Sequence, residues 1–159
     1  MDGLLMETKL HRELRAQGEQ YEQWVCDQWP LVYGKTLTRV IGRNNQYKYG
    51  DTYEGVEIKN DERMNNDRPT GNVYIETHEK ANKNNARYVE SGIRHPACRW
   101  YLIGDRREWF IFQKAILQKV DNTNPEWVTR IQTPTSMGFV MAKTWATGLM
   151  SKHHVFEAG

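Results

Sequence analysis

One stretch of the chain decides how the rest is arranged: Gly50-Asp51-Thr52-Tyr53-Glu54-Gly55-Val56-Glu57-Ile58-Lys59. Successive side chains of a strand face opposite ways, so a strand here places Glu57 and Lys59 on one face and the apolar residues between them on the other. The segment Tyr53-Glu54-Gly55 suits a three-residue hairpin loop, whose last position favours glycine in the left-handed conformation. That hairpin would pair Asp51 with Glu57.

Two directly opposed carboxylates have Cβ atoms roughly 5 Å apart and repel one another unless a cation lies between them. Mg²⁺ (or Mn²⁺) suits this position, because such an ion is held by one or two carboxylates, several waters and the phosphate oxygens of a substrate. Asp51 and Glu57 are therefore candidate metal ligands. Lys59 would stabilise the charge that develops on a phosphate or orient the attacking water. The alternative is a solvated strand face with a weak ion pair beside an ordinary turn aspartate.

These residues resemble the active-site motif of the PD-(D/E)xK nuclease superfamily, the restriction-endonuclease-like and resolvase-like proteins. In that family an acid on one strand and an acid-x-lysine on the next bind the metal and place the nucleophile, and Asp51, Glu57 and Lys59 match those positions. Gly50 stands where the motif has proline. Over residues 47–103 the chain also looks like small nucleases of phages and mobile elements. This resemblance implies that Glu76 lies near the site as a further catalytic acid, either a metal ligand or a group that orients the water.

The resemblance implies an α/β fold with a restriction-endonuclease-like core. In that core a central mixed sheet of about five strands is flanked by helices, in αβββαβ order with an extra strand. It implies a metal-dependent DNA endonuclease that hydrolyses phosphodiester bonds, formed by one domain over residues 1–159. Cleavage of both strands would favour a twofold homodimer. The alternative is a non-catalytic nucleic-acid-binding or assembly module that retains the fold.

Before the motif, apolar residues recur at helical spacing over residues 7–28, and Pro30 is expected to end that helix. Glu22 falls at the border of the apolar face. In the resembled fold the first helix often supplies an acid to the metal site, so Glu22 is either a further catalytic acid or a surface glutamate. Residues 31–41 alternate as a strand does, and three strands in a meander are expected from there to the motif.

Beyond the motif, residues 60–71 are polar and rich in turn formers, which predicts a loop. Arg63 and Arg68 could contact phosphates from it, or simply be solvated. Residues 72–78 alternate as a strand, which carries Glu76. Residues 79–90 are compatible with a helix. On that helix a cationic stripe would track the backbone of DNA or form an ordinary solvated face, and the side chains in question are Lys80, Lys83 and Arg87.

The second half of the chain alternates strands with one short helix. Residues 99–103 and 109–112 are apolar and aromatic, which is typical of buried strands. A helix is expected over 114–120 and a strand over 127–131. Residues 136–143 suit either a last strand or a helix.

Composition narrows the class of protein. The 159 residues carry a formal net charge of +2, so charge alone does not indicate a nucleic-acid binder. The two cysteines have no metal-ligand spacing, and no long apolar run predicts a signal peptide or a membrane span. A reducing, cytoplasmic location without membrane association is therefore the expectation.

Overall fold

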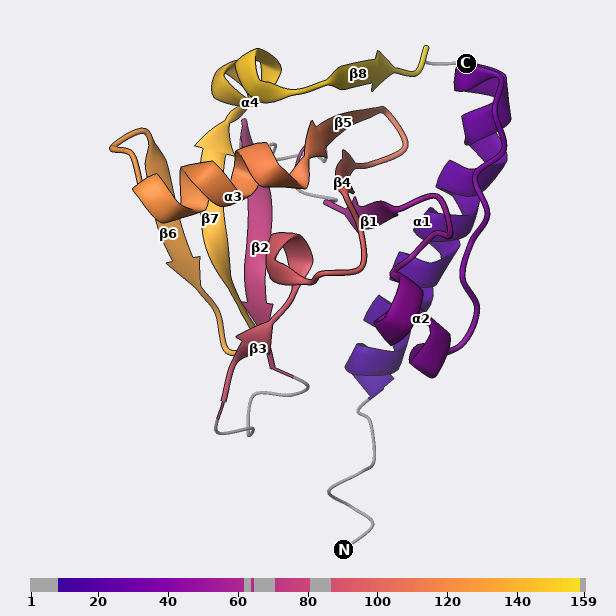
Figure 1. The fold of residues 1–159 in the computed structure, drawn as a ribbon, viewed down its shortest axis with the longest axis horizontal. Helices are drawn as coiled ribbons and strands as arrows, with labels where there is room; N and C mark the ends of the chain where they lie inside the picture. The colour runs from indigo at the N-terminus through magenta and orange to yellow at the C-terminus, as the bar shows by residue number, and fades with distance from the viewer. Residues whose placement is uncertain (1–8, 62–63, 65–70, 81–86, 158–159) are drawn as a thin grey trace, which may run out of the picture.

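The described residues form two four-stranded sheets and four α-helices (Figure 1). The computed structural model describes residues 9–61, 64, 71–80 and 87–157. The helices are α1 (Lys9–Tyr33), α2 (Arg43–Tyr49), α3 (Lys114–Thr123) and α4 (Lys143–Leu149), with the short 3₁₀ helix η2 (Gly92–Arg94). The first sheet has the order β1 (Val56–Asn60), β4 (Trp100–Gly104), β5 (Glu108–Gln113), β8 (Lys152–Val155). The second has the order β3 (Val89–Glu90), β2 (Asn72–Glu79), β7 (Ser136–Ala142), β6 (Val128–Gln132).

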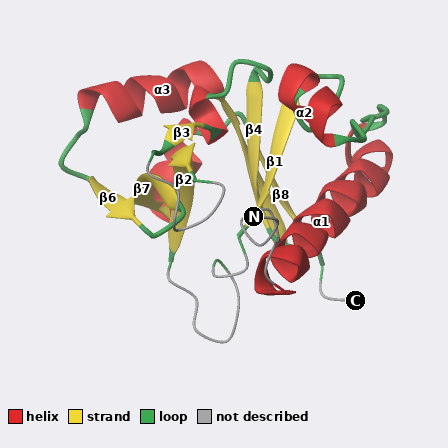
Figure 2. Cartoon of the chain, turned by 90° about the horizontal axis from the view of Figure 1, so that it is seen from below, coloured by secondary structure: helices red, strands yellow, loops and turns green. Residues whose placement is uncertain are grey.

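The first sheet is mixed and packs against α1. Strand β1 lies at its edge, parallel to β4, whereas β4, β5 and β8 are antiparallel neighbours. Figures 1 and 2 both show α1 along the outer side of this sheet. Between them lies an apolar cluster rich in aromatic side chains, in which Tyr21 and Val25 of α1 meet Val56, Ile58 and Trp109 of the sheet.

The second sheet is antiparallel and lies on the other side of the first (Figure 2). The larger apolar cluster joins Tyr101, Ile103 and Phe112 of the first sheet to Ile75 and Phe139 of the second, and α3 and α4 contribute to it. The expected α/β class is therefore correct. The expected single sheet of about five strands is wrong, since the described strands form two sheets of four.

Helix α1 continues through Pro30, which was expected to end it. The missing N–H costs one helical hydrogen bond. The last turn nevertheless packs Trp29, Val32 and Tyr33 against the cluster beneath α1. Gly34 then ends the helix with φ 69° and donates to the carbonyl of Pro30 at 2.9 Å. The strand expected over residues 31–41 is consequently wrong, and within it the structure shows only an isolated bridge from Arg39 to Thr52.

Two further expectations before the second sheet are also wrong. Tyr47 to Tyr49 belong to α2 and not to a strand leading into a hairpin, so no three-strand meander precedes β2. Of the helix expected over 79–90, Glu79 ends β2 and the last two residues form β3, while 81–86 lie outside the described residues.

In the second half of the chain, the strands and the helix expected from the sequence are observed. The expected strands are β4, β5 and β6, the expected helix is α3, and residues 136–143 form β7 and the first residue of α4. Trp109, Phe110 and Phe112 are fully or almost fully buried, as expected of core aromatics. No helix in the described part of the chain combines the length and the apolar character needed to cross a membrane.

Candidate active site

The polar face of β1 is the centre of the candidate site. Val56 and Ile58 pack toward α1, while Glu57 and Lys59 point the other way, toward the second sheet, which confirms the predicted strand and its alternation. Glu57 is only 8% exposed. Its Oε1 lies 3.9 Å from Lys59 Nζ, and its Oε2 lies 2.8 Å from Lys114 Nζ. A buried carboxylate thus lies between the buried ammonium group of Lys114 and the partly exposed ammonium group of Lys59.

Lys114 is the member of this group that the sequence did not indicate. It opens α3 directly after β5, is 3% exposed, and also donates to the carbonyl of His95 at 2.8 Å. A buried lysine normally requires a partner of opposite charge. Its position just past an apolar strand was the only available signal, because Glu57 is distant in the sequence.

Asp51 reaches β1 by a different route from the predicted hairpin. It lies in no strand, and β1 pairs with β4, so Asp51 and Glu57 do not oppose one another in a ladder. The turn before β1 is closed instead by the Thr52 hydroxyl, which bonds both the N–H and the carbonyl of Val56, and Gly55 adopts the predicted positive φ of 88°. The N–H of Ile58 donates to Asp51 Oδ2 at 2.7 Å, so this carboxylate lies against the free edge of β1.

Glu22 of α1 also belongs to this group of acids. Its Oε2 lies 3.5 Å from Arg39 Nε, and its side chain is 15% exposed. Burial, together with the negative charge of Asp51, raises the pKa of Glu22 to about 7 against the opposing charges of Arg39 and Lys59. The structure therefore brings Glu22 close enough to Asp51 and Lys59 to feel both charges.

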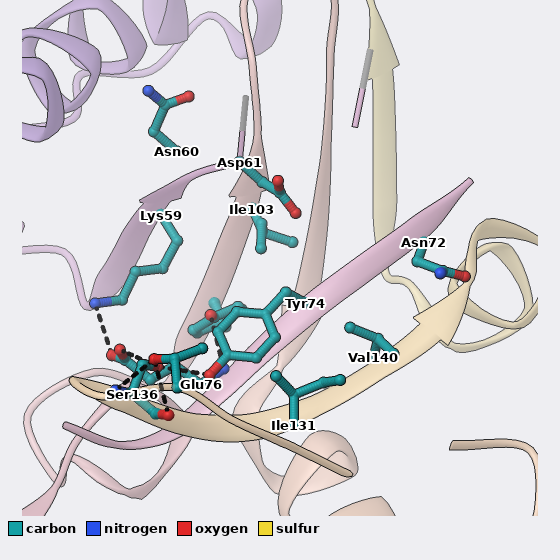
Figure 3. Close-up of a pocket in the computed structure, with 12 residues that line it drawn as sticks. Lys59, Asn60, Asp61, Asn72, Tyr74, Glu76, Ile103, Ile131, Ser136 and Val140 are labelled. Carbon is teal, nitrogen blue, oxygen red and sulfur yellow. Dashed lines mark hydrogen bonds and ion pairs between the residues drawn. The ribbon is translucent and has the colours of Figure 1, made fainter. Parts of the chain in front are cut away.

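Glu76 of β2 completes the group from the second sheet. Its Oε2 lies 3.2 Å from Lys59 Nζ, and its two oxygens each accept a hydrogen bond at 3.1 Å, from Ser91 and Ser136. Figure 3 shows the Lys59 side chain extending to Glu76 beside Ser136. The prediction that Glu76 lies near the motif is confirmed. Glu76 is close to Lys59 because the two sheets face one another here.

A cavity of about 450 Å³ adjoins Lys59 and Glu76 between the two sheets. Its wall is apolar at Ile131 and Val140 and polar at Asn72, and Tyr74 lies along it (Figure 3). The charged group therefore borders a space large enough for a small organic group.

Burial and the neighbouring charges shift the pKa values of the carboxylate and the lysine on β1. Burial raises the pKa of Glu57, and Asp51 adds to the rise, while Lys59 and Lys114 oppose it. The charge of Glu76 is the main cause of a raised pKa at Lys59, so this ammonium keeps its proton. An additional cation near Asp51 and Glu57 would relieve the repulsion among the acids.

The residues predicted to contact nucleic acid are placed only in part. Arg63, Arg68 and Lys83 lie outside the described residues. Lys80 follows β2 with its Nζ 4.4 Å from the centre of the Tyr88 ring, and Arg87 is exposed before β3. Since neither lies in a helix, the predicted helical stripe is wrong for these two residues.

Among the described residues, no three histidine, cysteine, aspartate or glutamate side chains are grouped as ready metal ligands. Both cysteines, Cys26 and Cys98, are buried thiols. Comparison of the chain with models of protein families, with curated proteins and with solved structures finds no match.

Proposed function

We propose that this protein is a metal-dependent nuclease that hydrolyses DNA phosphodiester bonds, with a restriction-endonuclease-like arrangement and a D…ExK site. One observation carries the proposal. Glu57 and Lys59 project from one face of an edge strand, and the carboxylate of Asp51 lies against the same strand at the Ile58 N–H. Burying several charges on a sheet face stabilises a fold little or not at all, so a catalytic role explains their presence better than stability does.

The donor atoms fit Mg²⁺ or Mn²⁺ in their chemistry. Carboxylate oxygens are the ligands that these hard ions prefer, and Asp51 and Glu57 would hold the ion. Burial is the main cause of the raised pKa of Glu57 and of Glu22, and the negative charge of Asp51 adds to the rise in both cases. A cation beside Asp51 would oppose that added rise. When bound, such an ion polarises a phosphoryl oxygen and acidifies a coordinated water.

Lys59 supplies the fixed positive charge of the site. Its ion pair with Glu76 holds the ammonium in place, and the two serine hydroxyls bonded to Glu76 hold that carboxylate in turn. A preorganised ammonium stabilises negative charge that develops on the phosphate without any rearrangement during the reaction. Glu76 is thus a positioning residue for Lys59.

Glu22 is suited to accept a proton. A general base works best when its pKa lies near the pH at which the enzyme operates, and burial raises the pKa of Glu22 to about 7. In this role Glu22 would take the proton of the attacking water. Arg39, at 3.5 Å, would hold the carboxylate in position.

The sequence also suggests the cellular environment and the oligomeric state in which the proposed nuclease would act. The chain would act on DNA in a reducing, cytoplasmic environment, as small phage-type nucleases do, with a homodimer favoured if both strands are cut.

The test is DNA cleavage by matched lysine variants. Wild type is incubated with plasmid and branched DNA and Mg²⁺ or Mn²⁺, beside Lys59→Met and the control Lys119→Met, in which an exposed lysine of α3 is changed. We expect Lys59→Met to lose about a hundredfold or more in rate and the control to match wild type. Equal rates for all three proteins would remove Lys59 from the mechanism.

The close contact between Lys114 and Glu57 favours a second candidate function, a non-catalytic nucleic-acid-binding or assembly module. The two ammonium groups near Glu57 balance the negative charge of its carboxylate without a metal ion. Such a module would bind DNA with an affinity that falls as salt rises, and would show no turnover with any divalent ion. Ca²⁺ separates the two functions, because it would promote DNA binding only where Asp51 and Glu57 form a metal site.

A further inference from the structure

Three tyrosines are exposed on and just after α2: Tyr47 is 81% exposed, Tyr49 is 40% exposed and Tyr53 is 55% exposed. The rings of Tyr49 and Tyr53 lie 5.5 Å apart. We call these three side chains the tyrosine platform. Large aromatic side chains normally bury most of their surface in a core or an interface, so three exposed rings on and just after one helix indicate a binding surface.

Helix α2 is held in place by polar contacts and not by a buried face, since none of its residues is buried. Gln46 Nε2 donates to the carbonyl of Val40 at 3.1 Å. Gly50, directly after the helix, has φ 82° and packs so closely on Cys98 that a Cβ there would lie 2.2 Å from the sulfur. These contacts fix the helix while its aromatic side chains remain outside.

Cations outnumber acids in the segment that carries the platform. Residues 35–54 contain Lys35, Arg39, Arg43 and Lys48 against Asp51 and Glu54. Lys48 Nζ lies 5.0 Å from the centre of the Tyr49 ring. Beside the helix is an open hollow of about 490 Å³ lined by Arg15, Arg39 and Arg43, with Glu19 as its one acid. Aromatic rings interleaved with cations are the combination by which proteins bind unpaired nucleic acid strands, because bases stack on the rings while phosphates meet the cations.

The platform also adjoins the candidate site. Asp51 follows α2 after one residue, and Arg39 both lines the hollow and contacts Glu22. The ring of Tyr47 lies 5.8 Å from that of His95, whose carbonyl accepts a hydrogen bond from Lys114. A nucleic acid strand bound at Tyr49 and Tyr53 would therefore lie close to Asp51, which is two residues from each of them.

We propose that the tyrosine platform binds an unpaired DNA strand next to the phosphodiester that is cut, so that the substrate has a single-stranded or unstacked segment. The link to cleavage rests on the proposed nuclease function, whereas the binding surface does not. The positive charge around the platform favours a polyanion over an apolar peptide or a second copy of this chain. A duplex, whose bases are stacked inside, offers the rings nothing to stack on and would contact the cations alone.

The experiment measures fluorescence anisotropy of a labelled oligonucleotide, as single strand and as duplex, in EDTA and in Ca²⁺. The proteins are wild type, Tyr47→Ala/Tyr53→Ala, the ring-preserving Tyr47→Phe/Tyr53→Phe, and Trp145→Ala. Trp145 is the control, because it is 48% exposed on α4, which lies on the opposite side of the molecule from α2 (Figure 1). Circular dichroism verifies that each variant is folded.

We expect the alanine pair to lose about 30-fold or more in affinity for the single strand, with a change of less than about threefold for the duplex. The phenylalanine pair and Trp145→Ala should bind as wild type does. Unchanged single-strand affinity in the alanine pair, an equal loss for single strand and duplex, or no binding by wild type would overturn the proposal.

A cleavage assay with Mg²⁺ or Mn²⁺ on the same proteins separates the two proposals. Cleavage that does not depend on the tyrosines would refute the platform and leave the nuclease function standing. Single-strand binding that depends on the tyrosines, without cleavage by wild type with either ion, would support the platform and refute the nuclease function.

Discussion

The two faces of β1 contrast within one short strand. Toward α1, Val56 and Ile58 join a cluster of aliphatic and aromatic side chains that has an obvious stabilising role. Toward the second sheet, the buried Glu57 pairs with the buried Lys114, and the partly exposed Lys59 pairs with Glu76. Burying charge costs desolvation energy that pairing recovers only in part. The apolar face accounts for the stability of the strand, whereas the charged face is the part of the strand to which we assign the proposed catalytic role.

The largest expected effect comes from breaking the apolar face. Trp109 is fully buried, and its Nε1 donates to Tyr33 Oη at 3.0 Å. We expect Trp109→Ala to lower the free energy of unfolding by about 3–5 kcal/mol, because it leaves a large cavity beneath α1. Urea denaturation measures the loss. A matched Trp145→Ala change, at a half-exposed ring, should cost about 1 kcal/mol or less, and equal losses would contradict a packing role specific to this face.

The charged face should respond differently. In Lys114→Met, Glu57 stays buried but loses its closest cation. We therefore expect a loss of about 3 kcal/mol in the free energy of unfolding. The double change Glu57→Leu/Lys114→Met removes both charges and should return stability to within about 1 kcal/mol of wild type. A double-mutant cycle by urea denaturation tests this pair. Additive losses would show that the buried charges stabilise the fold, contrary to our account.

A smaller effect concerns pH. The pKa of Glu22 is about 7 in the folded protein against an ordinary value of 4.5, so the folded state holds this proton more tightly than the unfolded state does. Its contribution to stability is therefore complete below pH 4.5 and is lost as the pH rises through about 7. We expect wild type to lose about 2–3 kcal/mol relative to Glu22→Gln between about pH 5 and about pH 8.

The check is thermal and urea unfolding of both proteins across that pH range. Glu19→Gln serves as the matched control, because Glu19 is an exposed glutamate on the same helix. Parallel pH profiles for wild type and Glu22→Gln would mean that burial and the charge of Asp51 do not raise the pKa of Glu22.

The alternation and the apolar runs in the sequence correctly predicted several strands, because these patterns depend only on residues within each strand. The alternation of Val56 to Lys59 and the apolar runs of β4 and β5 each report which side of a strand is buried, and these elements are where the sequence indicated. Pairing is not local. The partner of β1 is β4, and nothing in the motif distinguishes that parallel partner from a hairpin neighbour. The division of the strands into two sheets also depends on strand pairing, so the sequence did not indicate it.

The errors near α1 and α2 have a different cause. Pro30 is a poor helix residue, yet packing of Trp29 and Tyr33 outweighs the lost hydrogen bond. Tyr47 and Tyr49 resemble strand residues, but both are exposed on α2, so their apolar character did not report burial. In the candidate site, Glu22 and Glu76 could be named from position and resemblance. Lys114 could not, since only the tertiary fold brings it to Glu57.

The central claim is that the charged face of β1 is a metal-dependent phosphodiesterase site, and the most direct measurement is cleavage of a panel of DNA structures by wild type and Asp51→Asn. Asparagine keeps an oxygen that can accept the Ile58 N–H, so the turn should be retained while the charge is lost. We expect wild type to cleave DNA in the presence of Mg²⁺ or Mn²⁺, and we expect the variant to lose about a hundredfold or more in rate. Equal cleavage by both proteins, or none by wild type on any structure in the panel, would contradict it.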